Sequence, residues 1–221
     1  MRQTRAARTR RCLIEAAAAE FGRRGFAGTN LTHITGAAGL TSGALMFHFP
    51  SKRALAAAVH ACGSEVIRRG VDRITDGTPS ALQAVVDITH AVALLLHTDT
   101  TVRASYRLDG ELHGGLDGGL DDEHRWFGTW VPTLRGLCVR AQGSGELRAG
   151  TSPDAVAVVA VGLVTVQTAP AAVLPRRAED EPLPLAQVWE AVLTGVCPAG
   201  VGDTIQAAGT GRGGGSAPPG P

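Results

Sequence analysis

The feature that most constrains the fold is an apolar pattern at residues 30–52 that one glycine interrupts. Leu31 and Ile34 recur at helical spacing, Gly39 breaks the pattern, and a second short period resumes at Leu45. A glycine can adopt the positive φ that a tight bend between two helices requires. The stretch therefore predicts a helix, a turn and a helix, which is typical of a helix-turn-helix motif. The helical hairpin of an ordinary all-α protein would give the same periodicity.

The second helix of this motif begins with small side chains. Thr41 or Ser42 can cap its first turn with a hydroxyl group. Ser42, Gly43 and Ala44 would let its backbone come close to a flat, charged partner such as a DNA groove. The pattern therefore favours a DNA-reading role for this helix.

Positive charge concentrates around the motif, although the net charge of the whole chain is only +1. Residues 1–60 hold nine basic and two acidic side chains, whereas residues 61–221 hold 12 basic and 18 acidic ones. This asymmetry indicates a polyanionic partner for the N-terminal segment alone. Arginines crowd the start of the first expected helix, and we expect Arg5 and Arg8 there to contact phosphates. A solvated, charged helix end remains the alternative.

The rest of the chain carries helical patterns, and the fold class that we expect is all-α with about nine helices. A three-helix helix-turn-helix DNA-binding domain is predicted at residues 1–50, and a helical ligand-binding and dimerisation domain at residues 51–197. Residues 198–221 are rich in Gly, Ala and Pro and are predicted to be a disordered tail. Within the body, residues 126–142 are predicted to form one amphipathic helix.

The sequence gives little sign of an enzyme, a metal site or a membrane protein. Its histidines and acids show no HExxH spacing and no Ser-His-acid set, so an enzyme that uses a helical pocket is a remote alternative. The four cysteines are far apart, which predicts free thiols and neither zinc nor disulfides. We expect no cofactor and no metal. No apolar run is long enough to span a membrane, and we expect a cytoplasmic protein.

The exact residues of the motif identify a family more specifically than its periodicity does. The run GLTSGALMFHFPSK, with FGRRGFAGTNLTHI before it, resembles the DNA-binding domain of the TetR family of one-component repressors, from the first helix through the start of the fourth. The resemblance implies a homodimer that binds a double-stranded DNA operator. With the two arginines above, the expected DNA-binding residues are Arg5, Arg8, Thr41, Ser42, Gly43, Ala44, Phe47, His48 and Lys52.

A second resemblance concerns the body. The segments WFGTWVPTLRGLCVRAQGSGELRAG and AQVWEAVLTGVCP look like the ligand domain of γ-butyrolactone receptors, a TetR subgroup whose members leave their promoters when a signal molecule binds. This implies that Trp130 packs over a ligand ring, that Trp126 lines the same face, and that Thr165, Gln167 and Thr168 offer polar groups. Plain core packing of the tryptophans, and bonding of the threonines to their own helix, remain alternatives.

Two departures from the family's pattern bear on the DNA contacts. Ser42 stands where lysine is common, and Met46 stands where a tyrosine commonly touches a phosphate. We therefore expect a repressor that a small lactone-like inducer, such as a γ-butyrolactone or butenolide, releases from a palindromic operator of antibiotic or secondary-metabolite genes. The alternative is a pseudo-receptor regulator that is ligand-independent or responds to an antibiotic.

Overall fold

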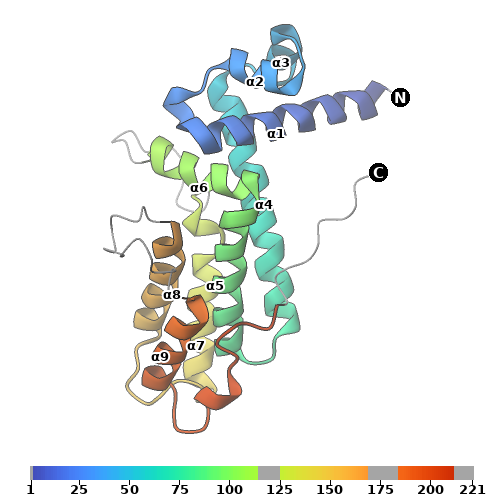
Figure 1. Ribbon diagram of the computed structural model, residues 1–221. Coiled ribbons are helices and arrows are strands. Elements are labelled where there is room, and N and C mark those ends of the chain that lie inside the picture. The colour runs from blue at the N-terminus through green and yellow to red at the C-terminus, as the bar shows by residue number, and fades with distance from the viewer. Residues whose placement is uncertain (1, 114–124, 169–183, 212–221) are drawn as a thin grey trace. The chain divides into compact units, whose positions relative to one another are not determined.

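The computed structural model describes residues 2–113, 125–168 and 184–211. Within these ranges the chain forms helices and no strand, as predicted (Figure 1). The α-helices are α1 (Arg2–Gly28), α2 (Leu31–Ala38), α3 (Ser42–His48), α4 (Lys52–Gly77), α5 (Ala81–Thr98), α6 (Thr100–His113), α7 (Val131–Gly143), α8 (Pro153–Thr168) and α9 (Leu185–Val196). Two short 3₁₀ turns are η2 (Phe127–Thr129) and η3 (Gly202–Thr204). The expectation of an all-α fold with about nine helices is confirmed.

By packing, the chain forms two compact units. Unit 1 comprises Met1–Ile67 and Leu95–Thr129, and unit 2 comprises Arg68–Leu94 and Trp130–Pro221. Helices α4 and α5 each contribute one part to each unit. The functional boundaries expected at residues 50 and 197 remain predictions.

Unit 1 has one apolar core beneath the helix-turn-helix. Leu13, Ala17 and Phe21 lie four residues apart on α1, so they share one face of the helix, and all are fully buried. Leu45 of α3 and Leu55 of α4 are fully buried in the same cluster. The periodic apolar positions of the sequence thus fix α1, α3 and α4 around a common core.

Close contact between α4 and α6 in unit 1 depends on Gly63. A Cβ atom at this position would lie 2.5 Å from the Cβ of Ser105 and 2.7 Å from the carbonyl oxygen of Thr101. Ser105 donates a hydrogen bond of 3.2 Å to the carbonyl oxygen of His60 on the facing helix. Only glycine fits at Gly63 without movement of a neighbour.

Unit 2 is held together partly by buried polar groups. Trp189 of α9 is fully buried, and its indole N–H donates a hydrogen bond of 2.8 Å to the hydroxyl group of Thr89 on α5. The Glu146 carboxylate accepts hydrogen bonds from the hydroxyl group of Ser80 and from the backbone N–H of Leu82, at 2.6 and 2.8 Å. Glu146 therefore caps the start of α5.

The environment of Glu146 also changes its acidity. Burial raises the pKa of this carboxyl, but hydrogen bonds from Ser80, Leu82, Ser144 and Ala81 outweigh burial, so the pKa of Glu146 is lowered. The carboxylate is the form that the surrounding donors hold.

The expectation of a disordered tail is wrong for residues 198–211. This segment, which we call the strap, returns to α5 and is anchored there by Gln83, Asp87 and His90. The backbone N–H of Gln206 donates to Gln83, and both the N–H and the hydroxyl group of Thr210 donate to Asp87. The composition of the strap does not indicate this order, because polar side chains of α5 hold its backbone in place. Residues 212–221 lie outside the described residues.

Two other sequence expectations can be compared with the described residues. The four cysteines are free thiols, as predicted, and burial raises the pKa of Cys138 to about 11. Helix α5 is long and apolar enough to cross a membrane by length and composition, but 67% of that stretch is buried within the fold. Helix α5 therefore has the burial of a core helix.

Candidate nucleic-acid interface and ligand-contact residues

Local hydrogen bonds form the helix-turn-helix as the sequence predicts. The Asn30 side chain accepts a hydrogen bond of 2.9 Å from the N–H of His33 and caps α2. Gly39 has a φ of 63°, and its N–H points back to the last turn of α2. The hydroxyl group of Thr41 accepts a hydrogen bond of 3.2 Å from the N–H of Ala44 and caps α3.

Helix α3 is anchored on one side and open on the other. Leu45 is fully buried and Phe49, just after the helix, is 3% exposed. Ser42, Gly43, Met46 and Phe47 are exposed, and these positions fall on the opposite face at helical spacing (the pattern i, i+1, i+4, i+5). The core contact thus presents one face of α3 to a partner.

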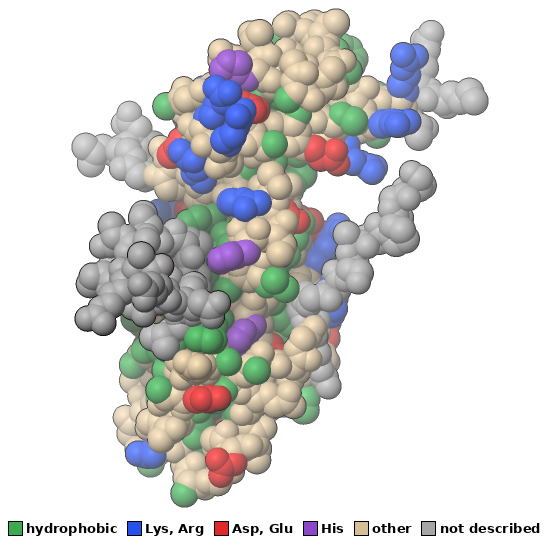
Figure 2. Space-filling view, viewed as in Figure 1, with side chains coloured by type: hydrophobic (Ala, Val, Ile, Leu, Met, Phe, Trp, Pro, Cys, Tyr) green, Lys and Arg blue, Asp and Glu red, His purple; other side chains and the backbone are tan. Residues whose placement is uncertain are grey.

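The start of α1 supplies positive charge next to this motif. Arg5 and Arg8 are exposed and border a groove of about 540 Å³ that Thr9, Cys12, Ala38 and Leu40 also line. Figure 2 shows blue basic side chains at the N-terminal end of α1. This groove joins α1 to the end of α2, so the arginines lie within the same unit as the motif.

Lys52, one of the expected DNA-binding residues, is the first residue of α4. The Ser51 hydroxyl caps this helix by accepting a hydrogen bond of 3.0 Å from the N–H of Ala54. The Lys52 ammonium lies 4.5 Å from the centre of the Phe26 ring. A cation at a helix N-terminus can bind an anion together with the free backbone N–H groups. His48 contacts the rings of Phe47 and Phe49 at the end of α3.

Side chains of helix α6 hydrogen-bond the backbone of α1 at a kink near its end. Gly25 has a φ of 74° within α1, and the N–H of the next residue, Phe26, donates a hydrogen bond to the Glu111 carboxylate. Arg107 donates to the carbonyl oxygens of Gly22 and Arg23 at 3.1 and 3.2 Å. Glu111 and Arg107 of α6 thus hydrogen-bond the backbone of α1 on either side of the kink, and these bonds fix the orientation of α1 relative to α6.

The same contact makes Glu111 more acidic. Burial raises the pKa of the Glu111 carboxyl, but hydrogen bonds from Arg107 and Phe26 outweigh burial and lower the pKa. Glu111 is thus held as the anion that the α1 backbone requires.

The predicted helix at residues 126–142 differs from the structure. Trp126 precedes the 3₁₀ turn η2. Trp130 occupies the N-cap position of α7 without a capping hydrogen bond from its side chain, and the helix begins only at Val131, with Pro132 in its first turn. Proline is favoured in the first turn because its missing N–H would be unpaired there. The expectation that the two tryptophans share one helix face is therefore wrong.

Both tryptophans are nevertheless fully buried. In unit 1, the ring of Trp126 meets the ring of Tyr106 edge to face at 4.8 Å between centroids. The backbone N–H of Trp126 also donates a hydrogen bond of 3.1 Å to the Asp109 carboxylate on α6. Trp130 belongs to unit 2. Their roles as ligand contacts remain predictions.

The polar ligand candidates lie at the end of α8. Thr165 donates a hydrogen bond of 3.0 Å to the carbonyl oxygen of Gly162, one turn earlier in its own helix, as the alternative interpretation foresaw. Gln167 and Thr168 are the last residues of α8, but their side chains lie outside the described part of the chain.

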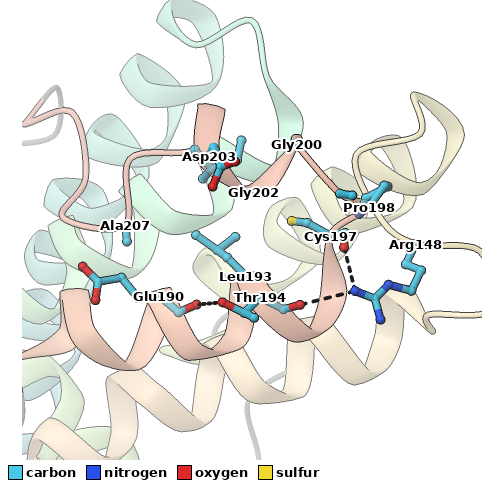
Figure 3. A pocket seen from close by; sticks show the side chains of 12 residues that line it. Arg148, Glu190, Leu193, Thr194, Cys197, Pro198, Gly200, Gly202, Asp203 and Ala207 are labelled. Atoms are coloured by element: carbon cyan, nitrogen blue, oxygen red, sulfur yellow. Dashed lines mark hydrogen bonds between the residues drawn. The ribbon is translucent and has the colours of Figure 1, made fainter.

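A pocket that no sequence pattern indicated is lined by residues of the strap and of α9. It has a volume of about 350 Å³ and is bordered by Leu193, Cys197 and Ile205 together with the exposed acids Glu190 and Asp203 (Figure 3). Arg148 closes one side, where its guanidinium donates to the carbonyl oxygens of Thr194 and Cys197. Trp126, Trp130 and Thr165 do not border this pocket. Among the described residues no three metal-ligating side chains gather at one point.

Comparison with known proteins places these features in a family. Residues 13–59 match the family of bacterial regulatory proteins named tetR. The A-factor receptor protein of Streptomyces griseus is 29% identical over 206 residues, which span 90% of this chain and 68% of that protein.

Two solved structures extend the similarity over nearly the whole chain. A γ-butyrolactone receptor, an ArpA-like protein, is 26% identical with a TM-score of 0.75, and the match covers 93% of this chain and 96% of that one. Full-length TylP, a TetR regulator from Streptomyces fradiae, is 32% identical with a TM-score of 0.60, and the match covers 94% of this chain and 87% of that one.

These relatives are regulators, and their agreement with the geometry of α1–α4 identifies the N-terminal helices as a DNA-binding head. The expectation that the chain is not an enzyme is confirmed by this kinship. The protein belongs to the TetR family of DNA-binding transcriptional regulators and resembles its γ-butyrolactone receptors.

Proposed function

We propose that this regulator is a cytoplasmic homodimeric repressor that a small apolar lactone releases from a palindromic operator. The observation that carries the proposal is the pairing of a capped, one-sided α3 with the exposed arginines of α1 in a single unit. Base contacts would come from Thr41, Ser42, Gly43, Ala44 and Phe47, and phosphate contacts from Arg5, Arg8, His48 and Lys52.

Dimerisation is supported by an apolar surface in unit 2. Helix α8 exposes Val158 and Val159 by 72% and 41%, and Val158 borders a groove of about 350 Å³ with Val131 and Val161. Exposed valines that lie together on one helix are typical of a protein interface. A helix-turn-helix reads one half-site, so two heads at a fixed spacing are needed for a specific operator.

The ligand would act in unit 2 by contacting Trp130 and the polar end of α8. Trp130 is a fully buried aromatic ring, and Thr165, Gln167 and Thr168 follow one another closely on α8. Trp126 belongs to unit 1 and stays a separate prediction as a ligand contact. If the ligand bound the non-DNA form a hundredfold more tightly, about 2.7 kcal/mol per site would be available to separate the head from the operator.

The test is a gel shift at fixed salt with the DNA upstream of the protein's own gene, with and without a lipid extract of the producing culture. We expect a shift that the extract abolishes. The variant Trp130→Phe should still shift the DNA and lose release. Trp189→Phe is the matched control, because this buried tryptophan bonds Thr89 on α5 and lies outside the proposed ligand set; it should respond like the wild type.

The second candidate is a pseudo-receptor that binds DNA without lactone control or responds to an antibiotic. It is favoured by Ser42 and Met46, which replace the charged and phenolic side chains common in the family. A shift that the extract leaves intact would support this candidate, and abolition of that shift by an antibiotic would identify the inducer class. The genes that lie next to the bound operator would show whether the protein regulates antibiotic or secondary-metabolite genes.

A further inference from the structure

The open face of α3 has an unusual composition for a surface that reads DNA. It exposes Met46 by 49% and Phe47 by 82%, beside Ser42 and Gly43. Helix α3 contains no Lys, Arg, Asp, Glu, Asn or Gln. The side chains that make bidentate hydrogen bonds to guanine and adenine are therefore missing from this helix.

The arginines and the lysine that we assign to DNA contacts lie outside α3. Arg5 and Arg8 lie on α1, where they border the groove with Ala38 and Leu40 at the end of α2. Lys52 begins α4 and is drawn to the face of the Phe26 ring. These positions suit phosphates, which supply affinity without sequence information. Sequence must then be read by what α3 itself exposes.

An apolar side chain can distinguish one base feature in the major groove, the C5-methyl group of thymine. Phe47 projects its ring into solvent, and the ring of His48 packs against it edge to face at 5.2 Å between centroids. Met46 lies beside it with a flexible thioether that adapts to irregular surfaces. Leu45 is fully buried between them and the core, so the helix cannot rotate to hide them.

We infer that Met46 and Phe47 determine operator specificity by packing on thymine methyl groups. The inference rests on the proposed function and deepens it, because it assigns the chemical feature that this head recognises. The operator half-site would contain at least one thymine whose methyl group, and not only its hydrogen-bonding edge, is needed for affinity.

The experiment begins with selection of an operator from random-sequence DNA by the full-length protein. Each thymine of the selected site is then replaced by deoxyuridine, which removes only the methyl group, and affinity is measured by fluorescence anisotropy at fixed salt. Burial of one methyl group contributes about 0.8 kcal/mol, so we expect about a fourfold loss of affinity for each methyl contact.

The variants Met46→Ala and Phe47→Ala connect the effect to the side chains. Both residues are exposed, so the variants should keep the wild-type circular dichroism spectrum and the wild-type salt dependence of binding. Each should bind the thymine and the deoxyuridine site equally well at the position that it reads. Val139→Ala is the matched control, because it shortens an exposed apolar side chain on α7, outside the DNA-binding head, and it should retain the full preference for thymine.

The outcomes separate this inference from the proposed function. A selected operator that binds equally with and without its thymine methyl groups would overturn the inference and leave the repressor intact. A methyl preference that survives in both alanine variants would also overturn it. If no sequence is selected at all, the proposed function fails, and the inference fails with it.

Discussion

Replacement of Asp87 by alanine should release the strap from α5. Asp87 is 3% exposed, and its carboxylate accepts hydrogen bonds from the N–H and the hydroxyl group of Thr210 at 2.8 and 2.6 Å. It also accepts one of 3.0 Å from the Gln83 amide. In Asp87→Ala these donors lose their acceptor, whereas the bonds of the strap to Gln83 and His90 remain.

The magnitude follows from the two bonds that reach the strap. A hydrogen bond to a charged group contributes about 1.5–3 kcal/mol, and removal of the carboxylate also removes the cost of burying a charge. We therefore expect a loss of about 3 kcal/mol for Asp87→Ala. For a chain of this size that corresponds to a decrease in Tm of about 6–12 °C.

Thermal unfolding by circular dichroism gives the change in Tm, and hydrogen exchange of the peptide that covers residues 198–211 locates it. The amides of Gln206 and Thr210 should exchange faster in Asp87→Ala. Asp203→Ala is the matched control, because this carboxylate is exposed on the strap, and its Tm should change little. Unchanged exchange of the strap peptide in Asp87→Ala would refute the reasoning.

Three further predictions concern stability and the head. Glu146→Gln should lower the free energy of unfolding by about 2 kcal/mol at pH 7. Because the pKa of Glu146 is lowered in the folded protein, the wild-type advantage is present above the unfolded pKa of about 4.3 and is lost as the pH falls through the folded pKa. Urea unfolding at several pH values would measure this loss. Thr41→Ala removes the cap of α3 and should cost about 1 kcal/mol, seen as about fivefold weaker operator binding that Thr41→Ser restores. Gly63→Ala should cost about 1–3 kcal/mol of unfolding free energy through its clash with Ser105, whereas Gly36→Ala, which meets no atom within 4 Å, should not destabilise.

The helix-turn-helix could be predicted almost residue by residue, because local chemistry determines it. Asn30, Gly39 and Thr41 act through groups no more than four positions away, and those groups are visible in the sequence. The apolar positions Leu31, Ile34 and Leu45 likewise lie on the two helices, α2 and α3, that their spacing predicted.

The strap and the tryptophans could not be predicted because their structure depends on distant partners. Gln206 and Thr210 bond residues of α5 more than 100 positions away, and composition alone indicates disorder there. Pro132 was the available signal that α7 begins after Trp130, but the apolar period of residues 126–142 concealed it. The hydrogen bond from the backbone N–H of Phe26 to Glu111, next to Gly25, had no signal in the sequence beyond the glycine itself.

The central claim is that α1 and α3 form one DNA interface, and the salt dependence of operator affinity tests it most directly. Anisotropy titrations of the wild type and the double variant Arg5→Ala/Arg8→Ala would be compared over a range of salt concentrations. Each lost phosphate contact reduces the slope of log K against log salt by about 0.9, so a dimer that loses two arginines per protomer should show a slope reduced by about 3.6.

Arg140→Ala serves as the control, because Arg140 is exposed on α7 in unit 2 and should leave the slope unchanged. The account predicts a reduced slope with the preferred sequence retained in the double variant. An unchanged slope in Arg5→Ala/Arg8→Ala would contradict the assignment of α1 to the DNA interface.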